Sequence, residues 1–193
     1  RAAMDMPEIE IAAINVRNSE LDYLVYQLKY DSTFGRFPRS LDVYEDGIVI
    51  DGKKVPVYRE SEAKNIPWAE AGVEYVVEAT GAYVTTEKAM DHIKAGAKKV
   101  IISAPAKDKV TPTFVYGVNH ETLTADDHII SGASCTTNCL APMAKALNDY
   151  RELRTGFMTT IHAYTGDQMI LDGPHKKGDL RRARAGAINI VPN

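Results

Sequence analysis

The chain has 193 residues, 45% of them hydrophobic, which is enough to bury one good core in one or two domains. Its 23 Lys and Arg residues and 26 Asp and Glu residues give a formal net charge of −3, so no basic field favours nucleic acid or an anionic membrane as a partner. No stretch approaches 18 consecutive apolar residues and no apolar signal-peptide core opens the chain, so membrane spanning and secretion are not indicated.

The first part of the chain predicts one buried strand, one helix and a set of short antiparallel strands. Apolar residues fall on one face of the helix, and Asp-Gly pairs at 46–47 and 51–52 favour tight turns between the strands. The expected elements are a strand at 9–14, a helix at 21–28 and strands at 41–44, 47–50 and 54–58.

The central part predicts strands that alternate with helices. We expect strands at 75–78, 99–102, 114–117 and 128–130, with a helix at 86–95. This alternation is typical of an α/β fold with a doubly wound, mainly parallel sheet. A new unit is expected from residue 136, with a helix after Cys135, a strand at 156–161 and a Gly- and Arg-rich loop at 166–184.

Cys135 lies where an apolar strand is expected to end and a helix to begin. A cysteine attacks a carbonyl carbon as the thiolate, which an imidazole, a helix N-terminus or both can favour. The residues 138–147 have the composition of a helix start, with Pro142 expected in the first turn. Cys135 is therefore predicted at or just before a helix N-terminus, where backbone N–H groups favour an anion.

His162 follows the apolar run 156–161, so a strand there would direct this histidine toward a site at the end of the strand. Taken alone, a histidine is more often a core or loop residue than a base. Two further polar motifs surround these residues: Ser134 and Thr136 flank Cys135, and Thr165 follows His162 closely. These hydroxyls could equally cap helices or finish turns.

The residues 134–142 and 160–165 together resemble the glyceraldehyde-3-phosphate dehydrogenase family. The resemblance extends through 30–35, 78–81, 101–105 and 179–185, so it covers nearly the whole chain in the family's order. It implies a dinucleotide-binding domain at 1–135, with its first strand and helix missing, and the start of an α+β catalytic domain at 136–193. Because the family's chain is much longer, we interpret this sequence as an internal fragment.

The resemblance implies a reaction and the residues that carry it. Cys135 attacks the aldehyde of D-glyceraldehyde 3-phosphate to form a hemithioacetal, NAD takes the hydride, and phosphate displaces the resulting thioester. His162 acts as the base, while Ser134 and Thr136 hold the attacking phosphate. Thr165 holds the substrate's C3 phosphate, and Arg181 matches an arginine near the phosphate sites.

The resemblance also implies positions for the cofactor, with the Gly-rich pyrophosphate turn expected upstream of Arg1. Asn15 ends the first expected strand, where a polar residue can approach the adenosine ribose. The next position is normally an aspartate in the family and is Val16 here, so NADP is not excluded as a cofactor. The remaining cofactor-binding positions implied are Thr80, Gly81 and Ser103.

No metal site is expected, and the remaining arginines and histidines are expected to have no catalytic role. Two cysteines, Cys135 and Cys139, cannot supply a structural zinc site and indicate a reducing compartment, so we expect no metal and a cytoplasmic location. Arg182 and Arg184 are interpreted as solvated or interface charges. The four remaining histidines are expected at the surface: His92, His120, His128 and His175.

Three functions stay open. The phosphorylating glycolytic dehydrogenase leads, with a small-molecule substrate, inorganic phosphate, and a homotetramer as partners implied by the family. The second is erythrose-4-phosphate dehydrogenase, which hydrolyses its thioester; Thr165 favours the first. The third is a non-catalytic piece that acts only in binding, and we expect the isolated fragment to be inactive.

Overall fold

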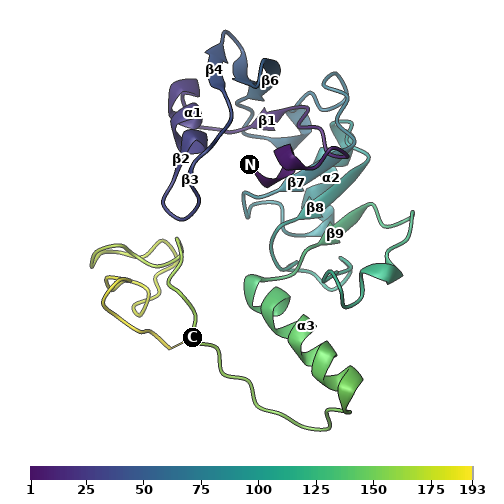
Figure 1. The fold of residues 1–193 in the computed structure, drawn as a ribbon, viewed down its shortest axis with the longest axis vertical. Coiled ribbons are helices and arrows are strands. Elements are labelled where there is room, and N and C mark those ends of the chain that lie inside the picture. The colour runs from purple at the N-terminus through teal and green to yellow at the C-terminus, as the bar shows by residue number, and fades with distance from the viewer. Residues whose placement is uncertain (193) are drawn as a thin grey trace. The chain divides into compact units, whose positions relative to one another are not determined.

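The computed structural model describes residues 1–192, and the chain divides into two compact units, Arg1–Glu152 and Leu153–Asn193 (Figure 1). All helices and strands of the described residues belong to the first unit. They are β1 (Ile14–Asn15), α1 (Leu21–Lys29), β2 (Tyr30–Asp31), β3 (Gly35–Arg36), β4 (Leu41–Tyr44), β5 (Gly47–Ile50), β6 (Lys53–Tyr58), β7 (Tyr75–Glu78), α2 (Thr86–Lys94), β8 (Lys99–Ile102), β9 (Ile129–Ser131) and α3 (Cys135–Tyr150), with 3-10 turns at Ala2–Asp5, Ala63–Asn65 and His120–Thr122.

A four-stranded sheet has the order β1-β6-β5-β4, in which β1 pairs with β6 in parallel and the other pairs are antiparallel. Ile48 and Val55 are its most deeply buried side chains. Helix α1 covers this core because its apolar residues recur at helical spacing: Leu21, Leu24, Val25 and Leu28 pack against the cluster. The strands β2 and β3 form a separate short hairpin.

A second sheet, β7-β8-β9, is entirely parallel. Val100 and Ile102 of the central strand are fully buried, and as alternate residues they lie on the same face of the sheet, which packs into the core. Helix α2 contributes the buried Ala89 to the same core. It begins at Thr85, whose Oγ1 accepts a hydrogen bond from Lys88 N at 3.3 Å, and it ends before Gly96, whose φ of +107° a side chain would strain.

The α/β class with a parallel sheet is confirmed. The strands expected at 41–44, 47–50, 75–78 and 99–102 are confirmed at those bounds, and the helices expected at 21–28 and 86–95 differ by one residue each. The strand expected at 9–14 is reduced to Ile14–Asn15, because β6 pairs with those two residues alone.

Two further strand predictions are wrong. Residues 114 and 115 are irregular and residues 116 and 117 belong to a turn, and the pairing nearby is a single bridge between Thr113 and Ser131. Residues 156–161 are irregular and exposed, with Phe157 and Ile161 fully accessible. A strand needs a partner for its backbone groups, and residues 153–192 contain no other strand to supply one.

No helix within residues 1–192 combines the length and the apolar character needed to cross a membrane.

Candidate active site

The site begins at the carboxyl edge of the parallel sheet. Glu78, Ile102 and Ser131 are the last residues of β7, β8 and β9, and they lie in one row of the sheet register. The loops that follow these strands therefore emerge side by side. In a doubly wound sheet this edge forms the ligand crevice.

Cys135 is the first residue of α3 and follows β9 after a three-residue connection. The prediction that it lies at a helix N-terminus is confirmed. Ser134 is the N-cap, and its Oγ accepts a hydrogen bond from Thr137 N at 3.0 Å. Cys135 is exposed, and the positive end of the helix favours a thiolate at this position.

The connection from β9 to α3 is held in an unusual conformation. Ala133 has a φ of +63°, in the left-handed region that an alanine rarely occupies. Its N–H donates to the Oγ of the fully buried Ser131 at 3.1 Å, and the Asn138 amide donates to Gly132 O at 2.7 Å and to Ser134 O at 2.9 Å. These bonds fix the orientation from which Cys135 leaves the sheet.

The expectation that Pro142 lies in the first turn is wrong, because α3 begins three residues earlier than the composition of 138–147 suggests. Pro142 lies inside the helix. It has no N–H to donate to the carbonyl of Asn138, so the helix loses one internal bond there.

Two of the loops at this edge carry the expected cofactor positions. Thr80 and Gly81 follow β7, and Ser103 follows β8 with its N–H donating to Glu78 O at 2.9 Å. Gly81 has a φ of +74° and open space around the position of a Cβ. A bound molecule can therefore approach the backbone of this loop closely.

Asn15 lies at the carboxyl end of β1 in the other sheet. Its side-chain amide donates to Glu60 O at 3.1 Å and accepts from Glu60 N at 3.0 Å, which ties the ends of β1 and β6 together. The next residue, Val16, is half-buried and packs against the core beneath α1. An apolar side chain at this position serves the core and offers a ribose no acceptor.

His162 lies in the second unit, in the irregular stretch before a turn. Its Nδ1 is 2.7 Å from Ala163 O, and since a carbonyl can only accept, Nδ1 carries the proton. In the neutral ring this leaves the lone pair on Nε2. The second nitrogen is thus the one suited to accept a proton.

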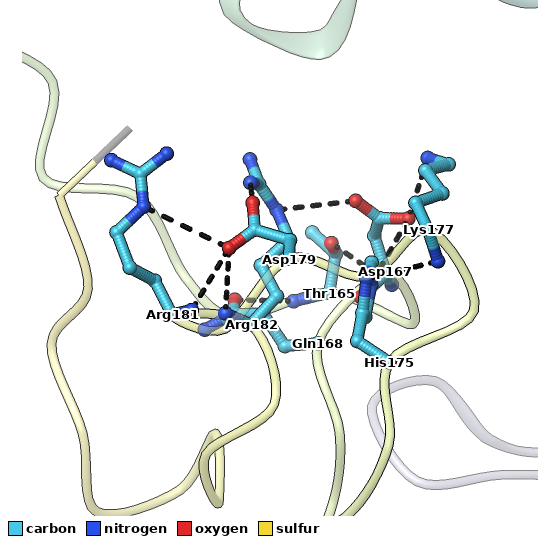
Figure 2. A network of polar contacts seen from close by, with 8 residues as sticks. All are labelled: Thr165, Asp167, Gln168, His175, Lys177, Asp179, Arg181 and Arg182. Carbon is cyan, nitrogen blue, oxygen red and sulfur yellow. Dashed lines mark hydrogen bonds and ion pairs between the residues drawn. The ribbon is translucent and has the colours of Figure 1, made fainter.

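Thr165 and Arg181 belong to a polar network within the second unit (Figure 2). Thr165 closes a turn, accepting from Gln168 N through its carbonyl at 2.9 Å. Arg181 lies beside Asp179, with its Nε 3.7 Å from Oδ1, and its side chain is 56% exposed. The hydrogen bond from the backbone N–H of Arg182 is the main reason that the pKa of Asp179 lies below its usual range.

Arg182 is not a solvated charge, which corrects that part of the expectation, while a role at an interface stays a prediction. Its Nε lies 3.2 Å from Asp167 Oδ2 and its Nη1 donates to Asp179. Asp167 also pairs with Lys177 at 2.9 Å, and that hydrogen bond is the main reason that the pKa of Asp167 is lowered. Arg182 therefore links two carboxylates, whereas Arg184 pairs with Asp172 at 3.1 Å on the exposed surface.

His92 is also misjudged as a surface residue. It is 4% exposed, its Nε2 lies 2.9 Å from Glu78 Oε2, and Trp68 Nε1 donates to its Nδ1 at 3.1 Å. The signal that could have found it is its spacing of three from Ala89, which places both residues on the apolar face of α2. The surface expectation is also wrong for His175, whose side chain is 4% exposed, whereas His120 is half-buried and His128 is exposed as expected.

The first unit brings together Ser134, Cys135 and Thr136 at the start of α3, along the edge from which the 79–82 loop and Ser103 also emerge. The second unit holds His162, Thr165 and Arg181. The pairing of Cys135 with His162 stays a prediction. Within residues 1–192 no group of three or more His, Cys, Asp or Glu side chains could hold a metal ion.

Comparison with known proteins gives matches over both units. Residues 1–86 match the family model "Glyceraldehyde 3-phosphate dehydrogenase, NAD binding domain", and residues 134–193 match "Glyceraldehyde 3-phosphate dehydrogenase, C-terminal domain". The whole chain is 51% identical to a glyceraldehyde-3-phosphate dehydrogenase of Clostridium pasteurianum and 53% identical to one of Coccidioides immitis. The chain spans 57% and 56% of the lengths of these relatives.

Proposed function

This chain belongs to the glyceraldehyde-3-phosphate dehydrogenase family, and we propose from this premise that the protein carrying it converts D-glyceraldehyde 3-phosphate to 1,3-bisphosphoglycerate in glycolysis, with reduction of NAD. The observation that supports the proposal most directly is the location of Cys135. It is an exposed cysteine at the first position of a helix that starts at the carboxyl edge of a parallel sheet. This is a location suited to a nucleophile that acts as a thiolate.

In the proposed reaction, the Cys135 sulfur attacks the aldehyde carbon and forms a hemithioacetal. The developing oxyanion meets the Cys135 backbone N–H, and His162 takes the proton of the hemithioacetal hydroxyl through Nε2. NAD, when bound, would supply the hydride acceptor, and loss of the hydride from the hemithioacetal carbon leaves a thioester on Cys135. Inorganic phosphate, held by Ser134 and Thr136, then displaces the thioester and releases the acyl phosphate.

The substrate's C3 phosphate is assigned to Thr165, with Arg181 nearby. A solvent-accessible guanidinium whose neighbour Asp179 is already paired with Arg182 retains hydrogen-bonding capacity for an anion. The assignment to these two residues is a proposal that the resemblance to the family supports.

The residues at the sheet edge fit a dinucleotide. Open space beside Gly81 allows a close backbone approach, and Ser103 is exposed one strand away. We assign cofactor contacts to Asn15, Thr80, Gly81 and Ser103. The apolar Val16 carries no charge that would repel a 2′-phosphate, so NADP is the competing cofactor.

We also propose the larger context of the protein. The domain boundary is placed between residues 135 and 136, and a homotetramer is inferred from the family, with the 166–184 loop at a subunit interface. Cytoplasmic location is supported by the small number of cysteines, both outside any disulfide framework.

The test is turnover by the full-length protein that carries this chain, with a Cys135→Ser variant as the control. We expect NADH and acyl phosphate to form together, and both to vanish in the variant because a serine hydroxyl is barely ionised at neutral pH. Release of a free acid from erythrose 4-phosphate would favour the alternative dehydrogenase. For the 193-residue chain alone we expect no turnover above the control, in keeping with a piece that acts only in binding.

A further inference from the structure

Three side chains form a buried chain of hydrogen bonds beneath the loop that follows β7. Trp68 Nε1–H donates to His92 Nδ1 at 3.1 Å, and His92 Nε2 lies 2.9 Å from Glu78 Oε2. None of the three residues is more than 5% exposed. A buried carboxylate and a buried imidazole are costly unless each is hydrogen-bonded, and here both are.

The chemistry of the donor groups determines which atom donates in each of these hydrogen bonds. An indole N–H can only donate, so His92 Nδ1 accepts and the ring proton lies on Nε2. His92 therefore donates to Glu78 as the neutral Nε2–H tautomer. Burial alone would raise the pKa of Glu78, but the hydrogen bonds from His92 and Thr80 outweigh it and hold this pKa below its ordinary value.

The second carboxylate oxygen of Glu78 holds the loop. Its Oε1 accepts from the Thr80 N–H at 2.6 Å and also from the Thr80 hydroxyl. Thr80 Oγ1 in turn accepts from Ala82 N at 3.1 Å. The N–H and the hydroxyl of Thr80 thus both donate to Glu78, so the cofactor contact assigned to Thr80 is left to its other atoms.

The whole 79–82 loop is exposed, and Gly81 is its one glycine. It is exposed, and within residues 1–192 its N–H has no hydrogen-bond acceptor. Gly81 has a φ of +74°, and the residue before it, Thr80, is held by two hydrogen bonds to Glu78. A backbone donor presented at the carboxyl edge of a parallel sheet suits an oxygen of a nucleotide phosphate or ribose.

We propose that Glu78, His92 and Trp68 are positioning residues that hold the 79–82 loop ready for the dinucleotide, so that Gly81 N–H meets the cofactor without a reordering cost. This inference rests on the proposed function. Because none of the three residues lies among those assigned to the chemistry at Cys135, they should set the affinity for NAD and leave the chemical step unchanged.

The decisive variant is Glu78→Gln, which keeps the shape of the side chain. The amide nitrogen of the introduced glutamine must face either the His92 N–H or the Thr80 N–H. In either orientation two N–H donors then point at each other, and one hydrogen bond is lost. In the full-length protein we expect about tenfold to hundredfold weaker NAD binding, the effect of losing a hydrogen bond to a charged group. The rate at saturating NAD should change by less than about threefold.

Two variants at position 92 separate positioning from packing. Gln can donate to Glu78 and accept from Trp68, so His92→Gln should keep more of the wild-type NAD affinity than His92→Leu does. His92→Leu can do neither and should resemble Glu78→Gln. If His92→Leu fails to fold, Trp68→Phe removes the indole N–H together with part of the ring volume and should also weaken NAD binding.

The matched control is Glu74→Gln, at an exposed glutamate just before β7 that pairs with Lys98. It should leave NAD binding unchanged. Wild-type NAD affinity in both Glu78→Gln and Trp68→Phe would overturn the inference.

A second readout is independent of activity. In the 193-residue chain, the Thr80 amide proton resonance should move to lower chemical shift in Glu78→Gln, because its charge-assisted bond is lost. An unchanged resonance would also overturn the inference. Absence of NAD binding by the wild type would instead refute the proposed function, while the amide signal still tests the positioning contacts.

Discussion

Replacing Ser134 with alanine should destabilise the first turn of α3, which carries Cys135. Ser134 Oγ accepts from Thr137 N at 3.0 Å, one of the helix N–H groups that has no intrahelical acceptor. Loss of such a cap costs about 1 kcal/mol. Helix α3 has no buried residue in this structure, so packing contributes little that could compensate.

The effect can be measured as amide hydrogen exchange at Thr137 in the 193-residue chain. A cost of about 1 kcal/mol corresponds to roughly fivefold faster exchange by local opening. Ser134→Gly should cost only about a few tenths of a kcal/mol, because glycine is a good N-cap. Thr85→Ala in α2 should cost less than Ser134→Ala, since its bond to Lys88 N is longer, at 3.3 Å. Equal exchange rates in Ser134→Ala and the wild type would refute the assignment of Ser134 as the cap.

Three further changes have defined outcomes. In the full-length protein, His162→Asn should lower the rate of oxidation by about 10²- to 10⁴-fold, the usual contribution of general acid–base catalysis, and an unchanged rate would remove His162 from the mechanism. Asp108 has a pKa of about 2 because it accepts hydrogen bonds from the Thr111 hydroxyl and N–H. Its depressed pKa contributes stability that is fully present above about pH 3.8 and is lost as the pH falls toward 2. Asp108→Asn should therefore unfold at a lower urea concentration at pH 7, and its stability should lack this dependence on acid pH. An equal acid dependence of stability in both proteins would contradict this. Ile102→Ala should lower the free energy of unfolding by about 2–5 kcal/mol because Ile102 is fully buried. Val77→Ala, on the exposed face of β7, should change the free energy of unfolding by about 0.5 kcal/mol or less. Similar urea midpoints for the two variants would argue against this core.

The sequence predicts the strands of the first unit well where turn residues bound a short apolar run. β5 and β8 are such runs, and their buried residues Ile48 and Ile102 lie at the positions expected of sheet cores. The same signal fails at 156–161, where the run has the composition of a strand. Composition reports what a segment can bury, whereas pairing depends on a second strand elsewhere in the chain, and residues 153–192 contain none.

The sequence predicts those features of the candidate site that depend on neighbouring residues. It does not predict the contacts between segments that are far apart in the chain. Cys135 at a helix start follows from a strand, a serine cap and a helical composition, all read within a few residues. The bonds of His92 to Glu78 and Trp68 join three separate segments, and a pattern on one helix cannot name partners on the others. The loops after β7, β8 and β9 lie together because the strands pair in a register that aligns their ends. The sequence of each strand does not state this register.

Backbone strain marks the point where the sheet passes into the site. Among residues 1–192, the non-glycine residues with positive φ are Asp51 and Ala133. Asp51 precedes Gly52 in the tight turn between β5 and β6, where the left-handed conformation is a property of the turn. Ala133 lies in no hairpin, and its conformation costs about 1 kcal/mol or more. It persists because Ser131 Oγ holds its N–H, and the result is that α3 begins one residue after the N-cap Ser134 with Cys135 at the sheet edge.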